Sequence, residues 1–275
     1  MRDSGRAPNP PCGILCPVCL IAFAQGTGEN LLVLAANRDE DHARPTLAAG
    51  PWTDAPDVFG GRDARDGGTW LGVARAGRLA AVTNVRGGLA GKAARSRGAL
   101  CRDFLIGDED AASYGRRVVA ERAIYADFNL LVCDGRSLFY VNRSSDTAVR
   151  VAPGVHGLSN AALDVPWPKV ERSTAALRRA LDGPPEALGP ELFAMLADRS
   201  SAPNDDLPDT GLSRELERDL APIFIASAVY GTRSSTVILW RKDGTLSFEE
   251  RSFGPNGVPT GAVRRELDVP RVPSK

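Results

Sequence analysis

Short apolar runs occur in pairs along this sequence, and the pairing restricts the folds that the chain can adopt. Two of the pairs are joined by an Asp-Gly dipeptide, at Asp134-Gly135 and Asp243-Gly244, which is a strong signal for a tight β-hairpin turn. Hairpins that follow one another favour antiparallel sheets over a parallel sheet. We therefore predict four hairpins, with strands at residues 19–24 and 31–37, 69–75 and 79–85, 128–133 and 138–142, and 232–240 and 245–253.

Helical spacing of apolar residues lies between these hairpins. It predicts helices at 98–106, 111–126, 168–181 and 190–197. The segment from 37 to 66 is rich in proline, glycine and charge and is expected to be a long functional loop; we expect a second loop at 200–209. The predicted fold class is α+β, with antiparallel sheets covered by helices.

The chain is expected to form one domain from residue 19 to residue 255. Residues 1–18 are polar, rich in proline and without periodicity, so we expect a disordered segment or a wrongly assigned N-terminal extension. Residues 256–275 are expected to be a C-terminal tail.

Bulk composition argues against several classes of partner and location. Lys plus Arg and Asp plus Glu both number 34, so the chain has no basic surplus with which to bind nucleic acid. No apolar run reaches the roughly 18 residues that a membrane span needs. Gly13–Ala24 is the nearest candidate for a signal peptide, but Pro17 interrupts it and a strand is favoured. Five unevenly spaced cysteines do not indicate a disulfide framework, which favours a reducing, cytoplasmic location.

Other motifs do not support their usual chemistry. Cys12, Cys16 and Cys19 have the C-x3-C-x2-C spacing of radical-SAM enzymes, but hairpins replace the barrel that such enzymes use, so coincidence is favoured. GGLAGKA around Lys92 is too short for a phosphate loop. Only His42 and His156 are present, which leaves little material for a histidine metal site. We predict neither a metal nor a cofactor.

Polar motifs stand at the ends of the predicted strands. They are ANRDE at 36–40, GRLAAVTNVRG at 77–87, GLSNA at 157–161 and YGTRSST at 230–236, and GGTWLG at 67–72 lies between the first two. Packing alone does not explain them. Together with RPT at 44–46, FGGRD at 59–63, FNLLV at 128–132, PWPKV at 166–170 and FEERSF at 248–253, they resemble the NRDE family, the transport and Golgi organisation protein 2 group.

This resemblance covers residues 19 to about 253 and implies a fold and a chemistry. The family is similar to N-terminal-nucleophile hydrolases, nearest to the choloylglycine and penicillin-V acylase type, whose fold is a four-layer αββα sandwich of two stacked antiparallel sheets. Cys19 stands where family members carry the cysteine that follows the initiator Met. The resemblance implies Cys19 as nucleophile with its freed α-amino group as base, Asp39 orienting that amine, Asn84 in an oxyanion hole, Asn160 holding the amine or substrate, and Arg233 beside the thiol. Substrate binding is assigned to Asn37, Arg38, Trp70 and Arg86.

The chemistry of these groups fits a chain poor in histidine. A thiol has a pKa of about 8.5 and an α-amine one of about 7.7–8, so the amine can accept the thiol proton near neutrality. An arginine nearby favours the thiolate. Each residue also has a structural interpretation: Cys19 as a small buried side chain, Trp70 as core, Asn84 and Asn160 as turn caps, and Arg233 with Asp39 as an ion pair.

Two departures from the acylase pattern bear on this assignment. Ala36 stands where the acylases have an arginine, and Cys19 is not N-terminal in the sequence as written. Translation from a valine start codon at Val18, or processing between Val18 and Cys19, exposes the amine; a misplaced start is favoured.

Two functions therefore remain open. The first is hydrolysis or transfer of an acyl group from a small amide or thioester through an acyl-Cys19 intermediate. The second is a non-catalytic carrier on the same fold that binds haem, a lipid or acyl-CoA, because relatives in the family are linked to haem mobilisation and lipid homeostasis. Both predict a small-molecule partner, and neither predicts an oligomeric state.

Overall fold

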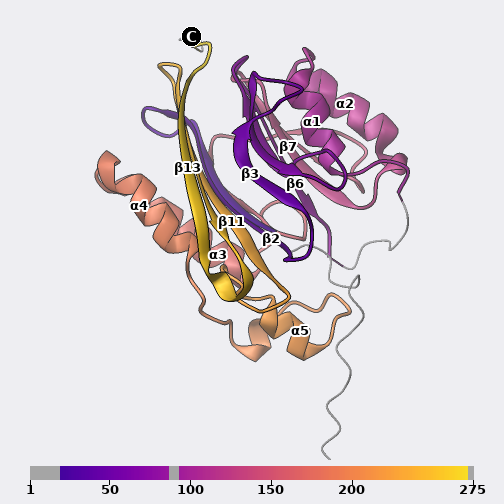
Figure 1. The fold of residues 1–275 in the computed structure, drawn as a ribbon, viewed down its shortest axis with the longest axis vertical. Coiled ribbons are helices and arrows are strands. Elements are labelled where there is room, and N and C mark those ends of the chain that lie inside the picture. The colour runs from indigo at the N-terminus through magenta and orange to yellow at the C-terminus, as the bar shows by residue number, and fades with distance from the viewer. Residues whose placement is uncertain (1–18, 87–92, 272–275) are drawn as a thin grey trace, which may run out of the picture.

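Two antiparallel sheets stack face to face, and helices cover both outer faces, in a computed structural model that describes residues 19–86 and 93–271 (Figure 1). The predicted extension at 1–18 and the motif around Lys92 lie outside the described residues. The two-sheet αββα arrangement confirms the predicted α+β fold class.

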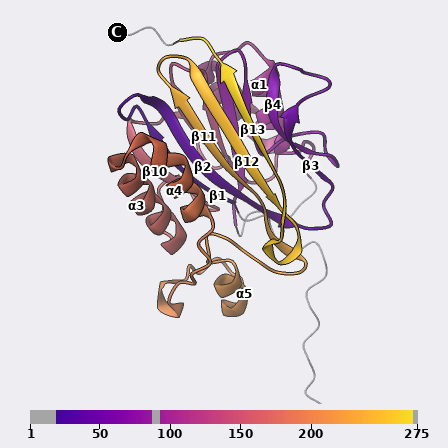
Figure 2. The same ribbon diagram turned by 60° about the vertical axis from the view of Figure 1, so that its left-hand side comes forward.

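One sheet has the strand order β10-β1-β2-β11-β12-β13. Its strands are β1 Cys19–Gln25, β2 Asn30–Asp41, β10 Gly154–Leu158, β11 Tyr230–Arg241, β12 Thr245–Phe253 and β13 Pro259–Asp268. Helices α3 (Pro168–Asp182) and α4 (Pro185–Leu196) lie against its outer face, with the short helix α5 (Arg214–Asp219) beyond one end (Figure 2).

The second sheet follows the chain order from β3 to β9. Its strands are β3 Thr46–Pro51, β4 Val58–Asp63, β5 Leu71–Ala74, β6 Arg78–Asn84, β7 Phe128–Cys133, β8 Leu138–Asn142 and β9 Val149–Arg150. Helices α1 (Gly98–Ile106) and α2 (Ala111–Glu121) cover its outer face. Short 3-10 turns occur at Arg122–Ile124, Asn204–Asp206 and Pro255–Gly257.

The alternation of side chains along β2 shows how the layers are built. Leu32 and Leu34 face the core between the two sheets, whereas Val33 and Ala35 face the core under α3 and α4. Successive side chains of a strand point to opposite faces, so a strand covered on both sides is apolar throughout this stretch. A third core packs α1 and α2 against the other sheet.

The predicted hairpin turns are confirmed. Gly135 and Gly244 have φ values of 81° and 92°, a left-handed conformation that glycine adopts without strain. The bounds of α1, β7, β8 and β12 agree with the predicted ranges.

Three expectations were wrong. The predicted loop at 37–66 holds the end of β2 together with β3 and β4, and its first polar residues, Asn37 to Glu40, are buried in β2 rather than solvated. Residues of the predicted tail form β13, an edge strand paired with β12. Most of its side chains are exposed, so its sequence lacks the alternation of apolar residues from which a strand is predicted. The helix predicted at 190–197 begins earlier, with Pro185 in its first turn.

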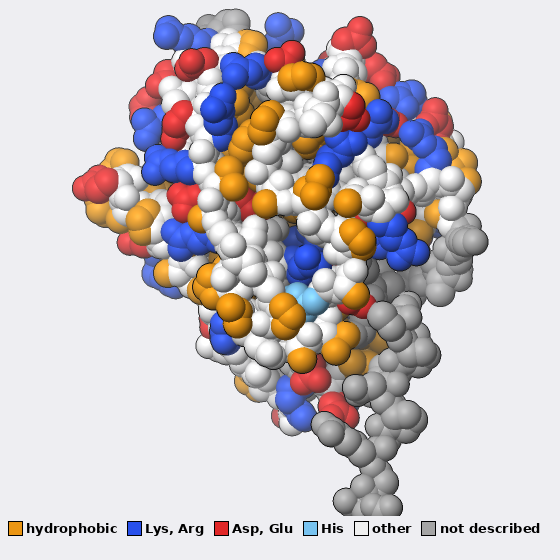
Figure 3. Space-filling view, viewed as in Figure 1, with side chains coloured by type: hydrophobic (Ala, Val, Ile, Leu, Met, Phe, Trp, Pro, Cys, Tyr) orange, Lys and Arg blue, Asp and Glu red, His pale blue; other side chains and the backbone are white. Residues whose placement is uncertain are grey.

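Within the described ranges no helix has the length and apolarity needed to cross a membrane. On the face shown in Figure 3, basic and acidic side chains are interspersed.

Candidate active site

Two neighbouring strands, β2 and β11, are polar at the same end, although this end is buried. On β2 the buried polar residues run from Asn37 to Glu40, and on β11 they include Thr232 and Ser234 to Thr236. Cys19 begins β1 opposite Arg38 of β2 in the strand register. The polar motifs of the sequence therefore meet where the two sheets approach one another.

Hydrogen bonds from the segment after β10 join the two sheets at this end. The Ser159 hydroxyl donates to the Cys19 carbonyl at 2.9 Å. The hydroxyl of Thr83, on β6, donates to the Ser159 carbonyl at 2.7 Å. The Asn160 amide donates to the Asn84 carbonyl at 2.8 Å. These contacts hold Cys19 and Asn84 at the edge of one space.

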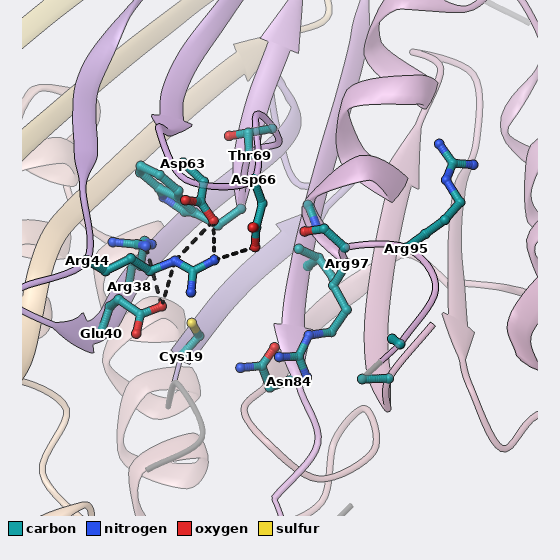
Figure 4. A pocket seen from close by; sticks show the side chains of 16 residues that line it. Cys19, Arg38, Glu40, Arg44, Asp63, Asp66, Thr69, Asn84, Arg95 and Arg97 are labelled. Carbon is teal, nitrogen blue, oxygen red and sulfur yellow. Dashed lines mark hydrogen bonds and ion pairs between the residues drawn. The ribbon is translucent and has the colours of Figure 1, made fainter. Parts of the chain in front are cut away.

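That space is a cavity of about 380 Å³. Figure 4 shows the Cys19 sulfur among the polar side chains that line it, with Asn84 and Arg97 together on one side and the Glu40–Arg44 cluster on the other. Cys19 is 7% exposed. Its thiol is thus covered by protein and reached from the cavity. The lining residues are Cys19, Arg38, Glu40, Arg44, Asp63, Asp66, Thr69, Trp70, Val82, Asn84, Ala93, Arg95, Ser96, Arg97, Gly98 and Ala126.

An ion-pair cluster forms one wall. Arg44 lies 2.5 Å from Asp63 and 2.7 Å from Asp66, and its guanidinium is 3.7 Å from Glu40. Arg38 lies 4.3 Å from the centre of the Trp70 ring, a cation–π contact, and 3.5 Å from Glu40. Charges held in this way give the cavity a fixed polar wall.

The environment of the Cys19 thiol keeps it protonated. Burial and then the negative charge of Asp39 raise the pKa of Cys19 to about 12, while a hydrogen bond from the backbone N–H of Asp39 and the charge of Arg38 act in the opposite direction. A neutral thiol is a weak nucleophile. Chemistry at Cys19 therefore requires a base.

Asp39 is wholly buried beneath this thiol. One carboxylate oxygen accepts from the Thr232 hydroxyl at 2.6 Å, and the other has no hydrogen-bond partner among the described residues. Burial raises the pKa of Asp39, and the charge of Lys169 is the foremost influence that lowers it. An unpaired buried carboxylate oxygen is costly and marks a place where another donor fits.

Several residues expected at the site do gather there. Cys19, Arg38, Trp70 and Asn84 line the cavity. Asp39 contacts the Cys19 thiol through its backbone N–H, and the Asn160 amide contacts the Asn84 carbonyl.

Three expected site residues lie elsewhere. The Asn37 amide donates to the carbonyls of Leu196 and Ile223 at 2.8 Å each, so it ties β2 to the α4 side of the sheet. Arg86 forms an ion pair with Glu217 and does not line the cavity.

Arg233 was expected beside the thiol, but it lines a neighbouring cavity of about 150 Å³ with Glu250. Its guanidinium donates to the carbonyls of Asp41 and Arg44. A register shift between Thr232 and Ser234 leaves Arg233 unpaired in the ladder with β2, and such a bulge redirects a side chain. Arg38 is instead the cation whose charge acts on the thiol.

Sequence reasoning missed Lys169, Arg97 and the Arg44 cluster. Lys169 stands inside the PWPKV motif, which was the available signal. Among the described residues, no group of three or more His, Cys, Asp and Glu side chains converges as a metal site would require.

The fold and this site together define a protein of two stacked antiparallel sheets with a cysteine at the floor of a polar cavity. The family described as Transport and Golgi organisation 2 matches residues 18–255. The chain belongs to this family.

Curated relatives support the membership over most of the chain. The Transport and Golgi organization protein 2 homolog of Bos taurus is 39% identical over 240 residues, covering 81% of this chain and 86% of that protein. The Homo sapiens homolog is 34% identical over 238 residues, with the same coverage. The Drosophila melanogaster protein is 25% identical over 266 residues, covering 86% and 92%.

Two solved structures are distant likenesses. A Caenorhabditis elegans ortholog of N-acylethanolamine-hydrolyzing acid amidase aligns with a TM-score of 0.45 at 13% identity, covering 80% of this chain and 92% of the other. A mutant of the conjugated bile acid hydrolase from Clostridium perfringens aligns with a TM-score of 0.48 at 10% identity, covering 90% and 92%.

Proposed function

We propose that the protein is a cysteine hydrolase or acyltransferase that acts on a small amide or thioester through an acyl-Cys19 intermediate. The observation that carries this proposal is the position of Cys19. Of the three described cysteines, which are all free, Cys19 alone lines the cavity. Cys101 and Cys133 belong to hydrophobic cores.

The proposed reaction needs the α-amino group of Cys19 to be free. That amine takes the thiol proton, and the sulfur attacks the substrate carbonyl carbon while its oxygen becomes negatively charged. The C–N or C–S bond then breaks, and the leaving amine or thiol takes the proton from the ammonium. Water, deprotonated by the same amine, attacks the acyl carbon and breaks the acyl-sulfur bond; the acid is released, and the Cys19 sulfur takes the proton back from the ammonium. Another nucleophile in place of water gives acyl transfer.

The surrounding side chains have supporting roles in this proposal. Asn84 stabilises the oxyanion, a contribution of roughly 3 kcal/mol in comparable sites. Asp39 accepts a hydrogen bond from the amine through its unpaired oxygen, and Arg38 with Trp70 contacts the substrate. Because the thiol pKa is strongly raised, the base has to act on a protonated sulfur.

The test combines the N-terminal mass of the purified protein with turnover of a panel of amides and thioesters. The proposal predicts a chain that begins at Cys19 and turnover that Cys19→Ala abolishes and Cys133→Ala leaves unchanged. An intact peptide spanning residues 10–20 in active protein contradicts the role of the amine.

A second candidate is a carrier that holds haem, a lipid or acyl-CoA in the same cavity without turnover. The raised pKa of Cys19 favours it, since a thiol that stays protonated is inert. Equal binding of haem or acyl-CoA to wild type and Cys19→Ala, with no turnover of the panel, selects the carrier. The odd number of cysteines supports a reducing compartment such as the cytoplasm for either function.

A further inference from the structure

A second cavity lies beside the one that holds Cys19, and no step of the proposed reaction uses it. Its volume is about 150 Å³, roughly the space of five water molecules in the liquid. Trp70 lines both cavities. Strand β3 of one sheet and strands β11, β12 and β13 of the other supply the remaining walls, so this second cavity lies between the sheets near their edge.

The strand register shows how near the two cavities are. Cys19 of β1 is opposite Arg38 of β2, and Arg38 is opposite Ser234 of β11. Residues in register on neighbouring strands share one face of the sheet, and the strands are about 4.8 Å apart, which puts Ser234 roughly 10 Å from Cys19. Arg38, stacked on Trp70, lies between them. The second cavity is therefore a neighbouring site and not a part of the Cys19 cavity.

The hydroxyl of Ser234 is buried at the second cavity without a partner. Ser234 is 4% exposed, and its Oγ makes no hydrogen bond within the described part of the chain. Burial raises the pKa of the nearby Glu250, and Ser234 acts against this rise, yet the two side chains form no hydrogen bond of normal geometry. Native proteins rarely leave a buried hydroxyl unsatisfied, so Ser234 marks a place where a ligand group fits.

Arg233, the neighbour of Ser234, brings a cation to the same cavity. Its Nη1 donates to the carbonyls of Asp41 and Arg44 at 2.8 and 3.1 Å, and among the described residues no carboxylate pairs with its guanidinium. Carbonyl oxygens satisfy a donor but do not balance its charge, and charges removed from water are normally paired. The two bonds explain a donor at this position, and an anion in the cavity explains a cation.

Glu250 is the one carboxyl among the described residues that line the second cavity, and its oxygens already accept hydrogen bonds. The backbone N–H of Ala49 donates to one oxygen at 2.7 Å, and the Thr236 hydroxyl donates to the other at 3.2 Å. The raised pKa of Glu250 disfavours the negative charge that would repel an anion. The unused hydrogen-bonding capacity therefore belongs to the donors Arg233 and Ser234, which fit an anionic oxygen.

The rim of the second cavity is apolar. Leu47 is 59% exposed there, and Ala48 and Phe253 also line the cavity. A ligand with its charged end at Ser234 and a short hydrocarbon part toward Leu47 removes apolar surface from water, which inorganic phosphate cannot do. The volume limits that hydrocarbon part to a few carbons. A short-chain carboxylate therefore matches the cavity better than a bare oxyanion.

We propose that the second cavity is a binding site for a short-chain carboxylate, which has the Arg233 guanidinium as its counter-ion and accepts a hydrogen bond from the Ser234 hydroxyl. This site does not depend on the reaction proposed at Cys19. An acid bound there lies beside Trp70, whose ring Arg38 contacts in the neighbouring cavity. Trp70 therefore provides a signal for occupancy.

The probe is butyrate, titrated into the full-length protein while NMR follows the indole N–H signal of Trp70, which Trp70→Phe identifies. We expect saturable binding of butyrate. Butyramide, which lacks the charge, and inorganic phosphate, which lacks the hydrocarbon, should each bind at least about tenfold more weakly. Absence of saturation by butyrate, or equal binding of butyramide, overturns the proposal. Equal or tighter binding of phosphate overturns the assignment to a carboxylate.

Substitutions locate the site. Ser234→Ala should weaken butyrate binding by about tenfold without lowering the thermal stability, since its hydroxyl has no partner to lose. Arg233→Gln keeps a donor for the two carbonyls but removes the charge, so it should weaken binding further. Arg95→Gln, at an arginine that lines the Cys19 cavity, is the matched control and should leave the affinity unchanged.

The result that contradicts this location is a wild-type affinity in both Ser234→Ala and Arg233→Gln, or a loss in Arg95→Gln as large as theirs, which would place the acid in the Cys19 cavity. If Arg233→Gln does not fold, Ser234→Ala and the comparison with butyramide decide.

Cys19→Ala separates this inference from the proposed function. It cannot form an acyl intermediate, and it should bind butyrate as wild type does. If wild type turns over no amide or thioester but binds butyrate with the expected dependence on Ser234, the proposed function alone fails. If wild type is active but its butyrate affinity does not depend on Ser234, the carboxylate site alone fails.

Discussion

The two halves of β2 are equally buried but chemically opposite. Residues from Leu32 to Ala36 are apolar and pack into the cores on both sides of the sheet, whereas Asn37 to Glu40 are polar and buried to the same degree. Strand β11 repeats the pattern in reverse, polar from Thr232 to Thr236 and apolar from Val237 to Trp240. Burial in this protein therefore packs apolar side chains at one end of the sandwich and holds polar side chains in place at the other.

The proposed site and the main apolar cores therefore lie at different ends of the sandwich. Apolar burial stabilises the fold by roughly 25 cal/mol per Å², while each buried polar group needs a partner to avoid a penalty. Substitutions in the apolar end should act on unfolding, and those in the polar end should act on chemistry, except where a polar side chain is itself a structural link.

The largest effect on stability is expected at Phe248, which is wholly buried between the sheets and contacts Phe59 with a ring-centre distance of 5.1 Å. Phe248→Ala should lower the free energy of unfolding by about 3–5 kcal/mol, measured by urea denaturation. Val258→Ala, at an exposed side chain, is the control and should change it by less than about 0.5 kcal/mol. A loss at Phe248 as small as that of the control contradicts the assignment of the core.

Asn84 tests the polar end. Asn84→Ala should lower kcat by about 10²–10³-fold because the oxyanion loses a donor, while the free energy of unfolding changes little. Steady-state kinetics on an active amide or thioester, with denaturation curves for the same samples, gives both quantities. If Asn84→Ala keeps the wild-type kcat, Asn84 does not stabilise the oxyanion.

Asn37 is the exception in the polar end, because its side chain joins β2 to other elements. Besides its two bonds to Leu196 and Ile223, its amide oxygen accepts from the Ser235 hydroxyl at 2.6 Å. Asn37→Ala leaves these groups buried without a partner, so we expect a loss of about 2 kcal/mol in the free energy of unfolding. A stability unchanged from wild type, with an altered KM instead, would return Asn37 to the substrate-binding set.

The smallest effect is a pH dependence at Glu250, a buried carboxyl on β12. Burial raises its pKa above the ordinary 4.5 despite hydrogen bonds from Ala49 and Thr236. The folded state thus keeps a proton that the unfolded state releases near 4.5, so the stability contributed by the neutral acid is full below that pH and is lost as the pH rises through the folded pKa.

Glu250→Gln should remove that dependence. We expect the stability of wild type relative to Glu250→Gln to fall as the pH rises from about 4.5 toward neutrality, measured by urea denaturation at several pH values. If the stability difference between wild type and Glu250→Gln stays constant or grows as the pH rises, the pKa of Glu250 is not raised by burial.

The sequence was informative wherever a local signal determined the structure. Asp-Gly turns and strand-length apolar runs predicted β7, β8 and β12, and helical spacing predicted α1, because neighbouring residues determine these elements. The motif resemblance also identified Cys19, Arg38 and Asn84, which line one cavity.

The remaining features depend on contacts between distant parts of the chain. Nothing local distinguishes Asn37–Glu40 in a buried strand from the same polar residues in a loop. The partners of Asn37 and Asp39 come from α4, from β11 and from the segment after α5. The side chain of Arg233 is displaced by a bulge that its sequence does not announce. Only the structure shows that Lys169 is buried, with its Nζ donating to the Leu220 carbonyl.

Cys19 is the proposed reactive sulfur of the cavity, and covalent trapping tests this role more directly than any substitution. Native protein is incubated with an acyl-directed electrophile such as a β-lactone, and peptide mass spectrometry locates the adduct. We predict one acyl group per chain on Cys19, a rate that falls sharply in Asn84→Ala, and no adduct in Cys19→Ala. Acylation confined to other residues, or an unmodified Cys19 in protein that still turns over substrate, contradicts the proposal.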